Sequence, residues 1–331
     1  MVVVEYAQTL LIVNPVAGGV TDTERLVTVL AGDVRGNGRS CTVHRTQEGD
    51  DLTALVRAAC ANGVELVIVA GGDGTIGDAV NGLVGTGVPL GIVPVGTGNL
   101  IARATGLPRR VEEAMELILG DHELIFLDTM FTGERHYVLN ISTGISSRSI
   151  HDTTTEEKRR FGMLAYIWRI VGHVFGFKSS RYDLHLDGYP RTVTATELLV
   201  SNGTLLERLP RVLGPRESFC DHRIDVYVFY GRWVMDYLRI ILRTIFRLER
   251  RDERFMHFPV TREIGITARW RSQPVQGDGE MIGWTPVNIR VEPGVVPLIA
   301  PRLGPATGGT PATGHTSAAG HTPATPEDSP P

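Results

Sequence analysis

The sequence predicts an α/β N-terminal domain with a parallel sheet, followed by a C-terminal antiparallel β domain. In the first 125 residues, short apolar runs of strand length alternate with helical patterns. That alternation is typical of a parallel sheet covered by helices. From about Leu127 onward, strand patterns follow one another with no regular intervening helices, which indicates antiparallel pairing. We therefore predict a nucleotide-binding α/β domain at 1–126, a β-rich domain at 127–302 and a tail at 303–331.

The N-terminal elements follow in regular order. Apolar, β-branched runs predict strands at Leu10–Val13, Thr42–Arg45, Leu66–Ala70 and Leu90–Val93. Helical spacing predicts helices at about Asp22–Leu30, Asp51–Cys60, Ile76–Val84 and Leu100–Thr105. Turns follow the four strands and begin at Asn14, Thr46, Gly71 and Pro94. Because ligands of parallel sheets bind at the carboxyl ends of the strands, all four turns should line one edge.

The second half contains strand patterns with two helical insertions. Strands are predicted at Tyr137–Ile141, Val193–Val200, Asp225–Tyr230, Glu263–Ala268, Val287–Val291 and Val295–Ile299. The insertions lie near Phe161–Phe175 and Trp233–Leu248. Residues 303–331 consist almost wholly of Pro, Thr, Ala, Gly, Ser and His, so they cannot bury enough apolar surface to offset chain entropy. We expect this tail to be disordered.

Composition limits the possible functions. The net charge of −4 over 331 residues argues against a nucleic-acid binder. Three widely spaced cysteines without a C-x-x-C pair predict neither a disulfide framework nor a zinc site, and they fit a reducing cytosol. The first residues lack the basic region and cleavage site of an export signal, and no run of about 18 apolar residues could span a bilayer. We expect a cytoplasmic protein.

The most informative stretch is Gly71-Gly72-Asp73-Gly74-Thr75, which lies between a predicted strand and a predicted helix. A strand, a glycine turn and a helix together point backbone N–H groups at an anion such as phosphate. Asp73 would repel phosphate unless a cation lay between them, so it indicates Mg²⁺ bound with a nucleotide. The alternative is a tight turn with a solvated aspartate.

The same residues satisfy the dinucleotide fingerprint G-x-G-x-x-G over Gly72–Gly77. That fingerprint also requires an acid about 20 residues further on, to bind a ribose hydroxyl. The corresponding region, Pro94–Asn99, contains no acid. The sequence therefore disfavours a Rossmann dehydrogenase.

Four further motifs lie along the chain. Asn14-Pro15 with Gly18-Gly19 and Pro94–Asn99 are two more glycine turns at strand ends, while Gln276–Glu280 and Ser218–Asp221 place acids beside predicted strands. Each alone is compatible with turn glycines and solvated turn acids. Together they resemble the motifs of the bacterial diacylglycerol kinase-like lipid kinases, a group that includes the sphingosine kinase catalytic core.

The resemblance runs from about Leu10 to Pro301. Gly-Gly-Asp-Gly-Thr alone is shared with NAD kinases, but its combination with Gly96–Asn99 and with Asp278-Gly279-Glu280 is more specific. The resemblance implies the NAD kinase/diacylglycerol kinase-like fold: an α/β N-terminal domain with a parallel sheet plus a C-terminal antiparallel β-sandwich domain. It also implies ATP and Mg²⁺ as cofactors and an active site between the two domains.

The resemblance further implies the roles of individual residues. The residues expected to contact ATP are Asn14, Pro15, Ala17, Gly18, Thr46, Gly71, Gly72, Asp73, Gly74, Thr75, Gly77, Thr97 and Asn99. Glu280 matches the family's general base, Asp278 a metal-binding or orienting group, and Asp73 a catalytic acid group of the phosphate turn. Asp221, with the backbone carbonyls of Ser218 and Arg223, matches a structural magnesium site.

The sequence departs from the family pattern at two places. Gly77-Asp78 stands where the family often has Asn-Glu, which shortens the acid and removes an amide. Cys220-Asp221-His222 stands where the family usually has Asp-Asp-Gly, and His222 lacks the backbone freedom of glycine. The second departure puts the magnesium site at Asp221 in doubt.

We therefore expect an ATP-dependent lipid kinase that converts diacylglycerol to phosphatidic acid, peripheral at the inner membrane face. An amphipathic helix over Trp233–Leu248, with Arg239, Arg243 and Arg247 in one stripe, is a candidate membrane contact or a helix packed on the β domain. Two alternatives remain: an NAD kinase-like enzyme with a soluble substrate, and a catalytically silent lipid- or nucleotide-binding protein. The acceptor lipid and the oligomeric state stay open, a homodimer included.

Overall fold

The structure is a computed structural model that describes residues 6–18, 20, 22–151, 179–202, 219–231 and 255–302. Met1–Pro301 forms one compact unit. The two predicted helical insertions and the predicted tail at 303–331 lie outside the described residues.

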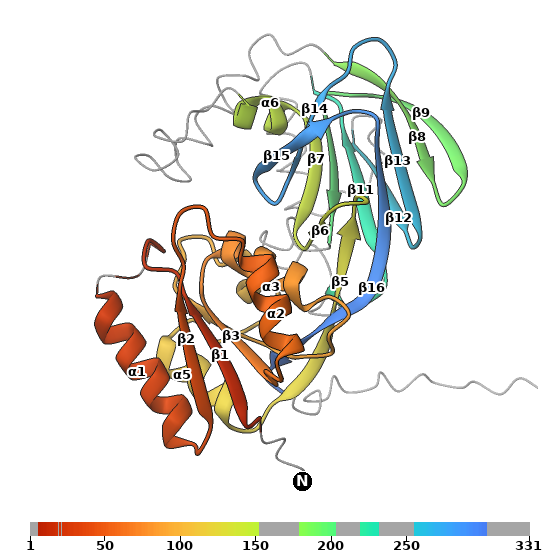
Figure 1. The fold of residues 1–331 in the computed structure, drawn as a ribbon. Helices are drawn as coiled ribbons and strands as arrows, with labels where there is room; N and C mark the ends of the chain where they lie inside the picture. Colours follow the sequence, from red (N-terminus) through yellow and green to blue (C-terminus); the bar gives the residue numbers. More distant parts are fainter. Residues whose placement is uncertain are drawn as a thin grey trace, which may run out of the picture. The chain divides into compact units, whose positions relative to one another are not determined.

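The N-terminal half contains the predicted parallel sheet (Figure 1). Its strands are β1 (Gln8–Val13), β2 (Ser40–Arg45), β3 (Leu66–Gly71) and β4 (Leu90–Pro94), in the order β2-β1-β3-β4. All three neighbouring pairs are parallel. β3 and β4 are buried along their whole length, as expected of strands covered on both faces.

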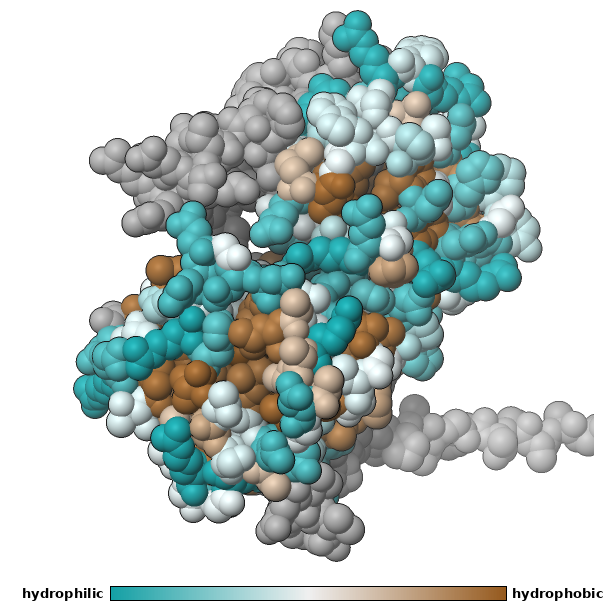
Figure 2. All heavy atoms as spheres, in the orientation of Figure 1, coloured by the Kyte–Doolittle hydropathy of each residue, from teal (hydrophilic) through white to brown (hydrophobic). Residues whose placement is uncertain are grey.

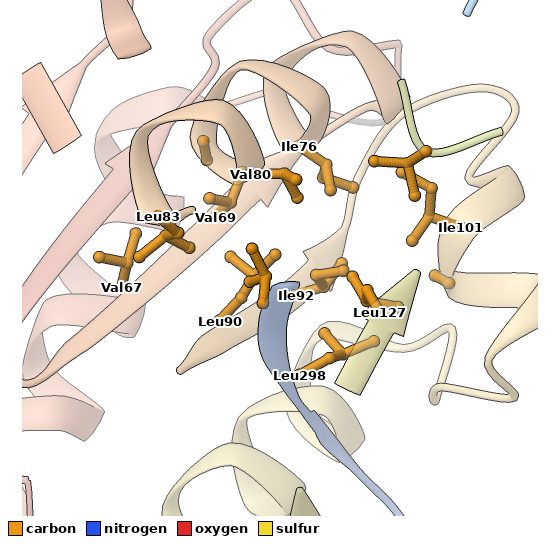
Figure 3. Close-up of a cluster of buried hydrophobic side chains, with 14 of the residues drawn as sticks. Val67, Val69, Ile76, Val80, Leu83, Leu90, Ile92, Ile101, Leu127 and Leu298 are labelled. Carbon is orange, nitrogen blue, oxygen red and sulfur yellow. The ribbon is translucent and has the colours of Figure 1, made fainter. Parts of the chain in front are cut away.

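Helices cover both faces of this sheet. They are α1 (Thr23–Gly36), α2 (Leu52–Ala61), α3 (Asp73–Leu83), α4 (Leu100–Ala104) and α5 (Val111–Leu119). Alternate residues of each strand enter two cores: α1 and α5 pack on one face, and α2 and α3 on the other. Figure 3 shows Ile76, Val80 and Leu83 of α3 lying over the apolar side chains of β3 and β4.

The C-terminal half is built from two antiparallel layers. One is a six-stranded sheet in the order β12-β11-β10-β7-β14-β15. Its strands are β7 (Asn140–Gly144), β10 (Glu197–Ser201), β11 (Ile224–Phe229), β12 (Phe255–Val260), β14 (Pro274–Gly277) and β15 (Glu280–Trp284). A short helix, α6 (Ile145–His151), follows β7 directly.

The other layer consists of β8 (Ser180–Leu186), β9 (Tyr189–Ala195), β13 (Glu263–Ala268) and the first part of β16 (Val287–Ala300). Apolar residues of both layers meet in a shared core, with Ile141 and Val226 on one side and Leu184 and Ile266 on the other. The predicted fold, an α/β domain with a parallel sheet plus an antiparallel β-sandwich, is confirmed.

Two long strands join the halves. β5 (Glu123–Phe131) runs antiparallel to β16 over most of its length and also pairs with β6 (His136–Tyr137). At its far end β16 pairs in parallel with β4 through Leu298 and Leu90, and Leu298 lies in the N-terminal core. The last strand of the chain therefore completes the first sheet, whereas the sequence analysis assigned all of 127–302 to the second domain.

Several elements differ from the sequence prediction. α3 begins at Asp73, three residues earlier than predicted, because the glycine turn itself enters the helix and Gly72 is its N-cap. The predicted strand Val193–Val200 is two strands, β9 and β10, and Val287–Ile299 is one strand with an irregularity between Glu292 and Val296. α5, β5, α6, β8, β12, β14 and β15 were not predicted.

Among the described residues, no helix is both long enough and apolar enough to cross a membrane. On the face drawn in Figure 2, apolar residues reach the surface in patches bordered by polar residues.

Candidate active site

The ends of four parallel strands meet at one edge of the N-terminal sheet, as predicted. The register pairs Val13 with Arg45 and with Ala70, and it pairs Gly71 with Pro94, so the strands end level with one another. The N–H of Asn14 donates to the carbonyl of Ala70 over 2.9 Å, and the N–H of Thr46 donates to that of Val13 over 3.0 Å. The four predicted turns therefore start side by side.

The turn after β1 is fixed by the side chain of Asn14. Its Oδ1 accepts the N–H of Val16 over 3.0 Å, and its Nδ2 donates to the hydroxyl of Thr75 over 2.8 Å. The N–H of Ala17 closes the turn on the carbonyl of Asn14 over 3.3 Å, with Pro15 between them. This turn is thereby joined to the first turn of α3.

The glycines of this edge permit close contact between the turns. A Cβ on Gly96 would lie 2.5 Å from the Cα of Gly72, and a Cβ on Gly18 would overlap the hydroxyl of Thr97. Real Cβ atoms essentially never approach another heavy atom within 3.0 Å. A side chain at Gly96 would therefore push apart the turns after β3 and β4, and one at Gly18 would displace the hydroxyl of Thr97.

The N-terminus of α3 lies at the centre of this edge. Gly72, its N-cap, has an extended backbone and provides no side-chain cap, so the first amide groups and the positive end of the helix dipole are placed as in helices that bind anions. Gly74 is exposed and Thr75 is buried. The Asp73 carboxylate accepts the N–H of Ile101 over 3.0 Å, which joins this helix to the start of α4.

Asn99 shapes the third turn. Its backbone is left-handed, with φ 47°, and its Nδ2 donates to the carbonyls of Pro94 and Gly96 over 3.1 and 2.7 Å. Its Oδ1 is buried and has no hydrogen-bond partner in the described part of the chain. Asn99 thus closes the turn that carries Thr97, a role that sequence reasoning did not assign to it.

Two residues of α3 that the sequence analysis did not select as site residues connect this edge to the second half. Asp78 forms an ion pair with Arg135. Asn81 accepts the N–H of His136 over 2.8 Å and donates to its carbonyl and to that of Gly77, both over 2.9 Å. Gly77 therefore contributes its carbonyl to this connection. Asn81 could have been identified from the sequence as a polar side chain one helical turn beyond the glycine motif.

The predicted catalytic turn lies between β14 and β15. Asp278 has a left-handed backbone, with φ 49°, and its carboxylate accepts the N–H groups of Val138, Leu139 and Asn140, each over 2.9 Å. Its own N–H donates to the carbonyl of Asn140 over 2.9 Å. Burial raises the pKa of Asp278 to about 6; the amide bonds oppose that shift, and the negative charge of Asp73 adds to it. Asp278 therefore orients the turn and is near enough to Asp73 to sense its charge.

Glu280 is exposed at the start of β15. Its negative charge acts on Arg135: burial lowers the pKa of that guanidinium, but Asp78 and Glu280 together outweigh burial and raise it. The predicted base is therefore near a cationic side chain that is held by α3. Sequence reasoning missed Arg135, because nothing in the local pattern distinguishes it from a solvated turn residue.

A chain of polar side chains runs from this turn into the sandwich. Gln276 accepts the N–H of Gly279 over 2.8 Å and donates to Asn140 and Ser142, both over 2.7 Å. The hydroxyls of Ser142 and Ser146 are 2.6 Å apart, and Ser146 bonds Glu197 through both its hydroxyl and its N–H. The turn that carries Glu280 is thus held from inside as well as through Asp278.

The predicted structural magnesium site is described only in part, because Ser218 lies outside the described residues. The Asp221 carboxylate accepts the N–H of Arg223 over 3.1 Å. Burial raises the pKa of Asp221, and the carboxylates of Asp128 and Asp225 contribute in the same direction. Among the described residues, no three His, Cys, Asp or Glu side chains are grouped so that they could hold a metal ion.

His222 takes the conformation that the family's glycine would favour, with φ 60°. The carboxylate of Asp128, which is fully buried, accepts the backbone N–H groups of His222 and Gly294, each over 2.7 Å. It also lies 3.2 Å from the ring Nδ1 of His222. The turn therefore adopts its left-handed backbone with histidine at position 222, although histidine lacks the backbone freedom of glycine. Asp128 was not predicted, because its partners lie far from it in the chain.

Comparison with known proteins identifies the family of both halves of the chain. Residues 8–127 match the diacylglycerol kinase catalytic domain, and residues 140–300 match the YegS C-terminal NAD kinase beta sandwich-like domain. The diacylglycerol kinase of Bacillus subtilis is 25% identical over 83% of this chain and 90% of its own length. A protein named "Probable lipid kinase YegS-like" from Enterobacter sp. is 28% identical over 60% of this chain and 66% of its own length.

Among solved structures, that of a diacylglycerol kinase from Bacillus anthracis superimposes with a TM-score of 0.70 at 23% identity, covering 90% of this chain and 98% of its own. This likeness concerns the fold. With both domain models matched in order along the chain, the protein belongs to the diacylglycerol kinase-like lipid kinase family.

Proposed function

We propose that this protein transfers the γ-phosphate of ATP to a lipid hydroxyl, with diacylglycerol as the acceptor and phosphatidic acid as the product. One observation carries the proposal: three glycine-rich strand ends converge on the N-terminus of α3, near the turn that presents Glu280. Phosphoryl transfer depends mainly on positioning and on neutralising charge, and this arrangement suits both.

The nucleotide phosphates would lie over the N-terminus of α3, where the amides of Gly74 and Thr75 face an anion. Glycines at positions 18 and 96 let the neighbouring turns close around them. Asn14 and Thr75 hold two of the turns in register through their shared hydrogen bond. These contacts support the predicted ATP site.

The acceptor hydroxyl would lose its proton to Glu280. A carboxylate that accepts this proton assists a weak nucleophile. Glu280 is exposed, whereas Asp278 uses its carboxylate to bind three backbone amides, so the two acids differ in what they can do. This difference supports Glu280 as the base and Asp278 as the orienting group.

We propose Asp73 and Asp221 as single carboxylate ligands of Mg²⁺ at two places, where phosphate, water or carbonyl oxygens would complete the coordination. Asp73 is a half-buried carboxylate beside the anion site, and Asp221 lies near two further carboxylates, so a cation would relieve their mutual repulsion. When bound, Mg²⁺ supplies charge neutralisation on the phosphates. Asp73 would hold the nucleotide metal, and Asp221 with the carbonyls of Ser218 and Arg223 the structural one.

Because diacylglycerol resides in a bilayer, the proposal includes peripheral association with the cytoplasmic face of the membrane. The decisive experiment is transfer of labelled γ-phosphate from Mg-ATP into a panel of acceptors in mixed micelles, with NAD in parallel and Glu280→Gln as control. Label in phosphatidic acid that is lost in the variant supports the proposal. Label in NAD, or none despite nucleotide binding, would favour a soluble substrate or a silent binder.

A further inference from the structure

Two tryptophans are exposed at one end of the C-terminal sandwich. The side chain of Trp270, in the connection between β13 and β14, is 85% exposed, and that of Trp284, at the end of β15, is 53% exposed. Tryptophan is nearly neutral on the hydropathy scale of Figure 2, so the exposed fraction rather than the colour identifies them. Single exposed apolar side chains are common on proteins, so the case for an interaction surface rests on the grouping of these two with each other and with charged residues.

Hydrogen bonds hold the two segments together. Ser272 donates its hydroxyl to the carbonyl of Thr285, and the N–H of Thr285 donates to the carbonyl of Gln273 over 2.8 Å. The N–H of Gln273 donates to the hydroxyl of Thr285 over 3.0 Å. The connection that carries Trp270 is therefore fixed against the residue that follows Trp284.

This end of the sandwich is positively charged. Arg269 and Arg271 flank Trp270, the N–H of Arg269 bonds the carbonyl of Arg181, and Arg148 bonds Gln273. Of these arginines, Arg269 is paired with Asp183 over 2.8 Å. We call Arg269, Trp270, Arg271 and Trp284 the tryptophan edge.

We propose that the tryptophan edge docks on the surface of an anionic bilayer. Tryptophan favours the boundary between headgroups and acyl chains, and arginine is attracted by anionic lipid. The inference rests on the proposed lipid kinase function, and it assigns the membrane contact to this edge rather than to the helix predicted at Trp233–Leu248, which lies outside the described residues.

The position of β15 makes this edge useful to the reaction. β15 begins at Glu280 and ends at Trp284. Four residue steps of extended strand span at most about 13 Å, so a lipid headgroup at a bilayer that touches Trp284 would be within one strand length of the proposed base. Among the described strands β15 pairs only with β14, so it lies at the margin of its sheet.

The test is sedimentation of the full chain with vesicles of phosphatidylglycerol and phosphatidylcholine, without ATP. Trp270→Ala and Trp284→Ala should each weaken apparent vesicle affinity about tenfold, because the truncated side chain no longer leaves water. Arg271→Gln should weaken it about fivefold on anionic vesicles only, and added salt should remove that difference. The matched control is Tyr189→Ala. This aromatic side chain is 70% exposed and lies at the turn of the β8–β9 hairpin, at the other end of the hairpin from Arg181.

Thermal melting of each variant separates lost docking from lost folding, and quenching of wild-type fluorescence by brominated lipid, reduced in Trp270→Phe, is a second measure. Unchanged binding of both tryptophan variants would overturn the proposal, as would loss of binding only when Arg239, Arg243 and Arg247 are changed to Gln. A dimer that Trp270→Ala dissociates without affecting vesicle binding would also overturn it. The sedimentation assay contains no ATP, so it measures docking independently of catalysis. A protein that binds vesicles but transfers no phosphate in the mixed-micelle assay would contradict the proposed function and leave the docking proposal standing.

Discussion

The side-chain amide of Asn14 donates a 2.8 Å hydrogen bond to the hydroxyl of Thr75. The two residues are 61 positions apart, and the bond joins the turn after β1 to the first turn of α3. Thr75 is buried, so its hydroxyl has little access to water as a substitute partner. The relative position of the two turns therefore depends on this bond.

Asn14→Ala should weaken ATP binding by about fivefold to tenfold, since losing a hydrogen bond of this kind costs about 1 kcal/mol. Thr75→Val should have a similar effect, and the double variant should be little worse than either single one, because both remove the same bond. Isothermal titration calorimetry gives the affinities. The control is Thr28→Val, whose hydroxyl bonds the carbonyl of Glu24 on the exposed face of α1. Fully additive losses would show that the two residues act separately.

Gly96→Ala should lower the free energy of unfolding by about 1–3 kcal/mol, the usual range for forcing a methyl group into a packed site. The reason is the 2.5 Å approach of its Cβ to the Cα of Gly72. Gly32→Ala is the matched control: it lies within α1, and a Cβ there meets nothing within 4 Å. That variant should gain up to about 1 kcal/mol. Urea unfolding measures both, and equal stability of the two variants would contradict this view of the turns.

Part of the fold could be predicted from the sequence because local residues determine it. The positions of the N-terminal strands and turns are local properties, because apolar β-branched runs and glycines at strand ends determine them over a few residues. The fold class and family motifs were therefore predictable. The predicted ATP-binding roles themselves stay predictions, although most of these residues lie along the same edge.

The parts that were missed depend on distant residues. Asp128, which was not predicted, bonds Gly294 across 166 positions. Asp278 was predicted as a metal-binding or orienting group, but its bond to Val138 across 140 positions was not. No local pattern distinguishes such carboxylates from solvated ones. β14 and β15 were read as one turn because glycines and acids fill their junction, and β16 was divided in two where its pairing with β5 is irregular.

Glu280→Gln should lower kcat about 100-fold or more while ATP affinity and melting temperature stay unchanged, as expected for loss of a general base. Glu280 is exposed, so the amide is tolerated by the fold. Asp278→Asn should instead lower stability by about 2 kcal/mol, because a carboxamide cannot accept all three backbone N–H groups. Rapid-quench kinetics and calorimetry separate the two effects. A Glu280→Gln enzyme with normal turnover would remove Glu280 from the role of base.

Ser146→Ala should lower kcat about tenfold with little change in KM for ATP, because it interrupts the polar chain that reaches Gly279 through Gln276. Its neighbour provides the control: Ser147 bonds only the N–H and carbonyl of Gly144 among the described contacts, so Ser147→Ala should affect stability more than turnover. Amide exchange at Gly279 should speed up in Ser146→Ala alone. Equal kinetics for the two variants would show that the polar network from Ser146 to Gln276 does not control the position of the turn.

Glu197 should make stability depend on pH near neutrality. Burial raises its pKa from 4.5 to about 7, while bonds from Ser146 and Ser142 oppose the shift only in part. A carboxyl group whose folded-state pKa is raised favours the folded state when protonated, so this contribution is fully present below pH 4.5 and is lost as the pH rises through about 7. At 1.36 kcal/mol per unit of pKa shift, the loss amounts to about 3 kcal/mol.

Glu197→Gln is uncharged at every pH and keeps an oxygen that can accept the bond from Ser146. The wild-type free energy of unfolding should therefore fall relative to that of Glu197→Gln between pH 4.5 and about 7, and the difference should level off on either side. Urea unfolding at half-unit pH steps measures both curves, with Ser147→Ala expected to run parallel to wild type because its hydroxyl bonds only Gly144 among the described contacts. Parallel curves for wild type and Glu197→Gln would show that this carboxyl group has the same pKa in the folded and the unfolded chain. A wild type that gains stability as the pH rises through this range would mean that the bonds from the serines outweigh burial.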